Sequence, residues 1–97
     1  MDKKIELENS LREILLITIS DPEATKEGRF HSFYNLMSFY TKNDPKKGAS
    51  LKAFFDEQEK EIGLSEELKG DLMMIFALCY QLSGLDDEAE AIYKDYS

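Results

Sequence analysis

Apolar residues recur every three or four positions through most of this 97-residue chain, the spacing that places them on one side of an α-helix. In the first segment the apolar stripe consists of Leu7, Leu11, Ile14, Leu15 and Thr18. The run from Ile14 to Ile19 is rich in β-branched residues, which favour strands. Because the helical spacing extends upstream through Leu7 and Leu11, the pattern predicts a helix here.

A second long helix is predicted after a short interruption. Asp21 followed by Pro22 is typical of an N-cap with proline at the first helical position, and predicts a short helical turn that ends at Gly28. The inward face of the long helix is predicted to consist of Phe30, Phe33, Tyr34, Met37 and Tyr40. A loop over residues 43–48 is expected to end this helix.

The aromatic run in this second long helix has two interpretations. It fits the helical spacing of a core face, and it also fits a face that is part core and part contact surface. In the second case Leu36 and Phe39, at the flank of the stripe, are the best candidates for exposure.

Two glycine signals divide the downstream half of the chain. Gly63 before Leu64, and Gly84 before Leu85, are typical of helix ends in which glycine takes the left-handed conformation. The helix before the first signal is predicted to turn inward Leu51, Phe54, Phe55 and Ile62. The first signal is thus expected to end that helix, and the second to end the helix after it.

The two last helices differ in how much of their surface is apolar. Ser65 is expected to cap the first of them, which is apolar over most of its circumference from Leu72 to Leu82 and is predicted to be the central, most buried helix. Asp86 is expected to cap the last helix, whose inward residues are predicted to be Ala89, Ile92, Tyr93 and Tyr96. The sequence therefore predicts an all-α single domain over residues 1–97, a compact antiparallel bundle of four to five short helices.

Charge is distributed unevenly between the two halves of the chain. Residues 1–50 carry eight basic and eight acidic side chains, whereas residues 51–97 carry four basic and twelve acidic ones, so the whole net charge of -8 lies in the second half. Such a balance disfavours direct binding of nucleic acid or of an anionic membrane. The acidic half has two interpretations, a solvated face that keeps the domain soluble or a docking surface for a basic partner.

The sequence contains few residues that point to catalysis or to a metal. Cys79 lies on an apolar stripe without a basic neighbour and is interpreted as a core residue, and the single histidine, His31, as a surface residue. Residues 21–32 lack the glycine and the final glutamate of a calcium loop. No phosphate-binding glycine loop or nucleophile elbow occurs, so no enzyme activity, catalytic residue, cofactor or metal is expected.

The stretch from Phe76 to Tyr93 resembles a single tetratricopeptide repeat. The residues that carry the resemblance are Ala77, Tyr80, Gly84, Ala89 and Tyr93, at the spacing that this family uses for close helix packing and for the turn between helices. It covers about a quarter of the chain, and the positions 34 residues upstream do not repeat it. The resemblance implies a protein-binding adaptor and does not imply catalysis.

These observations favour a small acidic module of the adaptor, chaperone, immunity or inhibitor type that docks on a basic protein surface. The partner-binding residues are predicted to be Asp56, Glu57, Glu59, Glu61, Asp86, Asp87, Glu88 and Glu90. The alternative is a self-associating structural module whose aromatic face forms a homodimer. The N-terminal residues carry no apolar signal core and the chain has no apolar run of membrane-spanning length, so a reduced, cytoplasmic compartment is expected.

Overall fold

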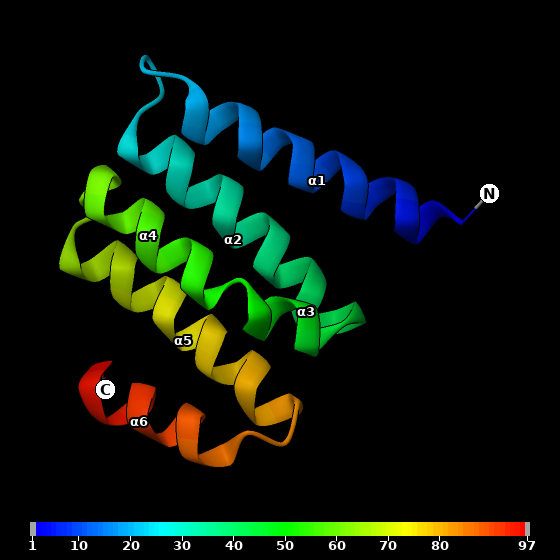
Figure 1. Cartoon of the computed structure of the whole chain (residues 1–97), viewed down its shortest axis with the longest axis vertical. Coiled ribbons are helices and arrows are strands. Elements are labelled where there is room, and N and C mark those ends of the chain that lie inside the picture. The colour runs from blue at the N-terminus through cyan, green and yellow to red at the C-terminus, as the bar shows by residue number, and fades with distance from the viewer. Residues whose placement is uncertain (1, 97) are drawn as a thin grey trace.

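The fold is all-α and consists mainly of one layer of helices with two further helices packed on one of its faces (Figure 1). The computed structural model describes residues 2–96. The helices are α1 (Lys3–Ser20), α2 (Lys26–Asn43), α3 (Pro45–Ser50), α4 (Lys52–Ile62), α5 (Glu66–Leu82) and α6 (Asp86–Tyr96). Helices α1, α2, α5 and α6 lie side by side in that order, and α3 with α4 covers the junction between α2 and α5. The molecule is flat, with Cα extents of 37 × 35 × 17 Å.

The helix-ending signals of the downstream half are confirmed. Gly63 and Gly84 both have positive φ angles, 62° and 82°, which residues with a Cβ rarely adopt. Leu64 packs back into the core, and the Ser65 hydroxyl accepts the Leu68 N–H at 3.3 Å as a cap. Asp86, by contrast, is the first residue of α6 and not its cap.

The expected short helix after Asp21 is wrong. Asp21 instead ends α1, and its carboxylate accepts the Glu23 N–H in the turn that follows. The cap of α2 is Thr25, whose hydroxyl accepts the N–H of Gly28 at 2.9 Å. Gly28 therefore lies in the first turn of α2 and does not end a helix.

Residues 45–50 form α3, although a loop was expected over residues 43–48, so residues 2–96 form six helices and not four or five. The Asp44 carboxylate accepts the N–H of Lys47, and Pro45 occupies the first helical position, where its missing N–H costs nothing. Gly48 brings α3 close to α5, because a Cβ at this position would lie 2.6 Å from the Cys79 sulfur. Helix α3 therefore packs against both α2 and α5.

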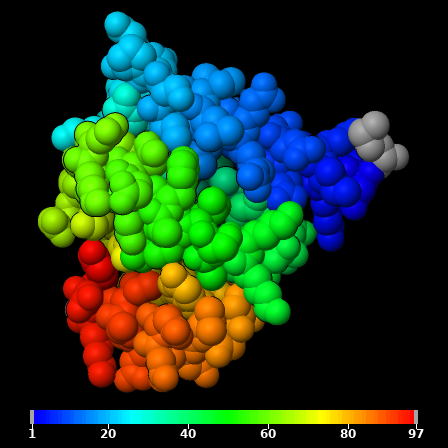
Figure 2. Space-filling view, in the orientation of Figure 1, coloured from blue at the N-terminus to red at the C-terminus, as the bar shows by residue number. Residues whose placement is uncertain are grey.

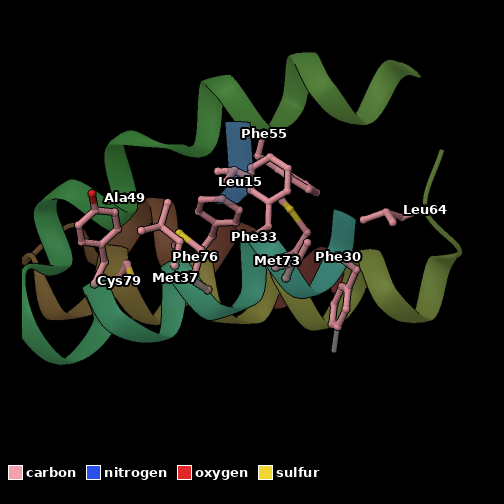
Figure 3. Packing of buried hydrophobic residues seen from close by; sticks show 14 of the residues in the cluster. Leu15, Phe30, Phe33, Met37, Ala49, Phe55, Leu64, Met73, Phe76 and Cys79 are labelled. Carbon is pink, nitrogen blue, oxygen red and sulfur yellow. The ribbon is translucent and has the colours of Figure 1, made fainter. Parts of the chain in front are cut away.

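An aromatic cluster forms the centre of the core (Figure 3). Phe55 of α4 packs its ring edge-on against Phe33 of α2, with centroids 5.2 Å apart, and at a tilt of 40° against Phe76 of α5, with centroids 5.4 Å apart. Seven residues of α2 are buried but five of α5, so α5 is not the most buried helix. The reason is that Met74, Leu78 and Leu82 of α5 lie on a face that no described helix covers, with 37–54% of each residue exposed.

The aromatic face of α2 is core. Leu36 and Phe39, the residues expected to be exposed, are 1% and 9% exposed because α1 packs against them, whereas Tyr34 is 39% exposed. The predicted aromatic surface for a homodimer is therefore largely buried within the chain itself.

The first helix is confirmed, but its predicted inward stripe is only partly correct. Among residues 3–20, Leu15 is the one that is fully buried, and Leu11 packs partly against the core. Leu7 and Ile14 are 50% and 52% exposed. In the part of the chain that the structure describes, no helix is long and apolar enough to cross a membrane.

Candidate functional site

The clearest depression near the predicted acidic residues is a groove between α3–α4 and the turn that joins α5 to α6. Its volume is about 700 Å³. Its lining residues are Lys46, Ala49, Ser50, Lys52, Ala53, Asp56, Tyr80, Ser83 and Leu85. In Figure 2 the groove follows the boundary between the green atoms of α3 and α4 and the orange atoms near the start of α6. We refer to it as the α4–α6 groove.

Local backbone geometry leaves an apolar side chain at one end of this groove. The left-handed Gly84 reverses the chain after α5, and the Leu85 N–H donates to the Tyr80 carbonyl at 2.8 Å. Leu85 consequently lies at the turn with 41% of its surface exposed. Ala49 and Ala53 line the groove with single methyl groups, which leaves room for a side chain from another molecule.

Acidic groups from two helices lie near the phenol of Tyr80. Burial raises the pKa of Tyr80, and the carboxylates of Asp56 from α4 and Glu88 from α6 raise this pKa further, while Lys52 lowers it. Lys52 lies 2.8 Å from Asp56 in an ion pair within α4. Of the predicted acidic residues, Asp56 lines the groove, and Glu88 acts on the pKa of the groove residue Tyr80.

The other acidic residues predicted on α4 are not part of this groove. Glu57 forms an exposed ion pair with Lys60 at 3.0 Å. Glu59 accepts the Leu64 N–H at 3.0 Å, so its carboxylate stabilises the end of the helix. Glu61 is exposed but does not line the groove. Consecutive helical residues point about 100° apart, which is why a run of acids along the sequence does not form one face.

The acidic residues of α6 are likewise divided between two sides of the helix. Asp86 and Glu90 line a shallow depression of about 280 Å³ together with Gln81, Ala89 and Tyr93. Glu90 also lies 3.6 Å from Lys94. Asp87 and Glu88 are exposed, and the carboxylate of Glu88 contributes to the raised pKa of Tyr80. The start of α6 is therefore acidic on more than one side.

Sequence reasoning did not single out the apolar lining of the groove. Tyr80 was noted for helix packing, and Leu85 only as the residue after the helix end at Gly84. The glycine signal did locate the turn, but it could not indicate that Leu85 faces open space. Ala49 and Ala53 were not singled out, because a small side chain indicates a groove only when the residues that face it are known.

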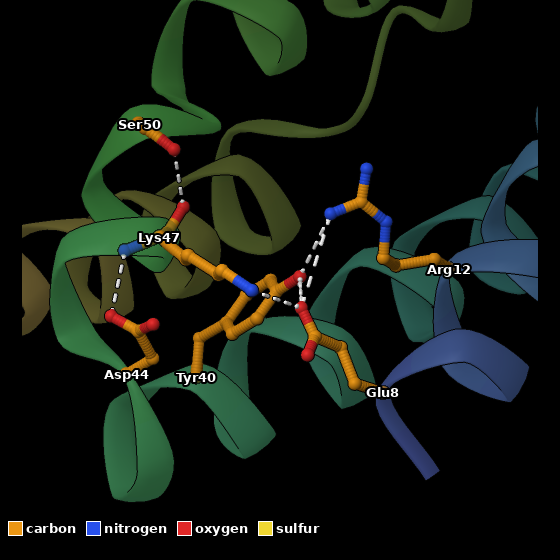
Figure 4. A network of polar contacts seen from close by, with 6 residues as sticks. All are labelled: Glu8, Arg12, Tyr40, Asp44, Lys47 and Ser50. Atoms are coloured by element: carbon orange, nitrogen blue, oxygen red, sulfur yellow. Dashed lines mark hydrogen bonds and ion pairs between the residues drawn. The ribbon is translucent and has the colours of Figure 1, made fainter. Parts of the chain in front are cut away.

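A second polar cluster joins α1 to α2 and α3 (Figure 4). The Tyr40 hydroxyl donates to the Glu8 carboxylate at 2.7 Å, and the Lys47 ammonium donates to the same oxygen at 3.0 Å. Arg12 donates to the Tyr40 hydroxyl at 3.2 Å. These hydrogen bonds lower the pKa of Glu8, while burial and the nearby carboxylate raise the pKa of Tyr40. At neutral pH Glu8 is therefore charged and Tyr40 is neutral, so these hydrogen bonds persist and stabilise the packing of α1 on α2 and α3.

The remaining chemically active side chains agree with their sequence interpretations. Cys79 is fully buried, its sulfur lies 3.3 Å from the Thr41 hydroxyl, and burial raises the pKa of its thiol. His31 is exposed and packs its ring edge-on against Phe30. Among residues 2–96, no three histidine, cysteine, aspartate or glutamate side chains are grouped so that they could hold a metal ion.

Comparisons with family models, with known proteins and with solved structures find no match to this chain. The residues that carry the tetratricopeptide resemblance lie in the hairpin of α5 and α6. Ala77 and Ala89 are both buried, and the Tyr93 hydroxyl donates to Gln81 across the two helices at 3.1 Å. Membership of that family remains a prediction, since two packed antiparallel helices of any origin meet these requirements.

Proposed function

We propose that this chain is a protein-binding module that docks on its partner through the α4–α6 groove. The partner segment carries an apolar side chain that enters the groove beside Leu85 and basic side chains that meet the acidic start of α6. The observation that carries the proposal is a groove lined by Asp56 and Tyr80 next to the exposed Leu85, with the carboxylates of Asp56 and Glu88 both acting on the pKa of Tyr80. Apolar contact with a charged rim is the usual anatomy of a protein interface.

Charge supports a basic partner. Residues 51–97 carry the whole net charge of -8. Within the groove Lys52 is neutralised by its ion pair with Asp56, and Lys46 lies at one end. Asp87 and Glu88 do not line the groove, but they are exposed just after its lining residue Leu85 and make the adjoining start of α6 negative. A field of this sign accelerates the approach of a basic surface and weakens as salt is added.

The proposal is tested by capture from a native lysate with matched charge variants. Tagged wild-type chain is compared with Asp87→Lys/Glu88→Lys and with a control, Glu23→Lys/Glu27→Lys, which makes the same change of charge in the neutral half. Asp87, Glu88 and Glu27 all lie in the first turn of a helix, so both variants carry a helix-dipole cost, which is larger in the groove variant; far-UV circular dichroism checks that both fold.

We expect the wild type and the control to retain one stoichiometric protein at low salt, and the groove variant to lose it. The same protein should dissociate at high salt. Retention by the groove variant, or the capture of nothing at low salt, would refute the proposal.

A second pair of variants tests the apolar part of the groove. Leu85→Ala should weaken capture roughly tenfold, because burial of a leucine side chain is worth about 1.5–3 kcal/mol when complete. The control is Leu82→Ala, which removes the same atoms from an exposed leucine of α5 that does not line the groove. Equal loss of binding in both variants would show that the groove is not the docking site.

A further inference from the structure

We propose that two copies of this chain pair through α1, with the two α1 helices antiparallel. This surface is distinct from the α4–α6 groove and does not rest on the proposed function. Helix α1 forms one edge of the layer, packs mainly on α2 and leaves its outer side uncovered (Figures 1 and 2). The contact between the two copies is made by side chains on that outer side, which do not face the core.

The exposed side of α1 has the spacing of a coiled-coil seam. Leu7, Ser10, Ile14 and Ile17 are separated by three, four and three residues, which is the alternation that keeps a stripe facing a second helix. Leu7, Ile14 and Ile17 are 50%, 52% and 61% exposed, and Ser10 is also exposed. We call these four residues the α1 seam. Three aliphatic side chains on one seam are more than isolated surface residues would present.

Charge at the two ends of the seam indicates a second copy in antiparallel orientation. Lys3 precedes the seam by four residues at its N-terminal end, and Asp21, the residue that ends α1, follows it by four residues at the C-terminal end. Antiparallel pairing that sets Leu7 opposite Ile17 of the second copy also sets Ser10 opposite Ile14 and Lys3 opposite Asp21. The same register therefore satisfies both the apolar and the charged positions, whereas parallel pairing would set like charges together.

A depression beside the seam fits this register. It lies between α1 and α2, has a volume of about 500 Å³, and is floored by Leu7, Leu11 and Phe39. Lys4 and Lys42 also line it. In the antiparallel pair Ile17 of the second copy enters beside Leu7, and Asp21 of that copy comes near the lysines. A helix C-terminus, which is partially negative, is favourable at this basic end.

The charge of the chain also determines how the pair responds to salt. Two copies of net charge -8 repel one another, and Glu13 lies next to the seam on its outer side. The α1 half is net neutral, so it is the part of the surface on which a second copy is least repelled. Added salt screens the repulsion and strengthens pairing. This response is opposite to that expected for the α4–α6 groove.

Sedimentation equilibrium of the purified chain tests the pairing. The seam is short, and interfaces of this size are weak, so the measurement extends to about 500 µM protein. We expect a mass approaching twice 11.2 kDa in moderate salt, and Ile17→Glu should return it to the monomer value. Leu16→Glu is the matched control, because Leu16 is the adjacent residue, is 54% exposed and lies off the seam; it should still pair.

Cross-linking distinguishes the antiparallel register from any other pairing. A chain carrying Leu7→Cys is mixed with a differently tagged chain carrying Ile17→Cys under mild oxidation, while the buried Cys79 remains protected. We expect a disulfide between the two kinds of chain in the mixture and little within either alone. A wild type that remains monomeric, a Leu16→Glu variant that loses pairing as Ile17→Glu does, or preferential cross-linking of each variant with itself would overturn the proposal.

Discussion

Replacement of Gly48 by alanine tests the close approach of α3 to α5. A Cβ at position 48 would lie 2.6 Å from the Cys79 sulfur and 3.1 Å from the Tyr40 Cβ. Ordinary contacts of such atoms begin near 3.4 Å, so the sulfur would have to move by most of an ångström. Cys79 is 0% exposed and Tyr40 is 1% exposed, which leaves neither side chain free to turn into solvent.

The expected magnitude follows from two opposing effects. Alanine is favoured over glycine within a helix by about 1 kcal/mol. Overpacking of a rigid core costs about 1–3 kcal/mol, and a clash this short places the substitution at the upper end. We therefore expect Gly48→Ala to lower the free energy of unfolding by about 2 kcal/mol, equivalent to a fall in Tm of about 8–16 °C for a domain of this size.

A double-mutant cycle with Cys79→Ala isolates the clash. Removal of the buried sulfur should by itself cost about 1 kcal/mol of unfolding free energy. It also makes room for the new methyl group, so the double variant should be less destabilised than the sum of the single variants by more than about 1 kcal/mol. Urea denaturation followed by far-UV circular dichroism measures all four proteins. Additive effects, or a Gly48→Ala variant as stable as the wild type, would refute the packing argument.

Two further predictions concern titratable groups in the structure. Glu8→Gln should lower stability at pH 7 by about 1 kcal/mol, because the charged hydrogen bonds from Tyr40 and Lys47 are weakened. Because the folded state lowers the pKa of Glu8, the charged carboxylate stabilises the fold above the ordinary glutamate pKa of about 4.3, and this contribution is lost as the pH falls through the lowered pKa. The melting temperatures of wild type and variant should therefore converge in acid. A difference in melting temperature that stays constant with pH would contradict the assignment. Cys79 should resist a thiol reagent in the native state and react on denaturation; rapid native labelling would show that α3 does not cover it.

The fold was predictable where a single residue determines the backbone conformation. Gly63 and Gly84 ended helices as expected, because few other residues adopt a positive φ angle. The segment over residues 43–48 was misinterpreted because glycine and proline, taken alone, indicate a loop. In the structure Asp44 and Pro45 start a helix, and Gly48 is there because α5 leaves no room for a Cβ.

The candidate site was less predictable, because it depends on which helices become neighbours. Helical periodicity identified the acidic runs but not that Asp56 and Glu88, 32 positions apart in the sequence, lie near one phenol. The same limit explains the error at Phe39, which is buried because α1 packs on that side of α2. Periodicity describes one helix at a time, whereas exposure depends on the pairing of helices.

The order of helices in the layer gives the molecule an electric dipole moment. Helix α1, with three basic and three acidic residues, and α2, with three basic residues and one acidic residue, lie at one edge, and α6, which begins with three consecutive acids, lies at the other (Figure 1). In an external field the molecule experiences a torque that turns its α6 edge toward positive charge. Near a basic surface the chain is therefore oriented before the two surfaces touch, with α6 leading and α1 trailing.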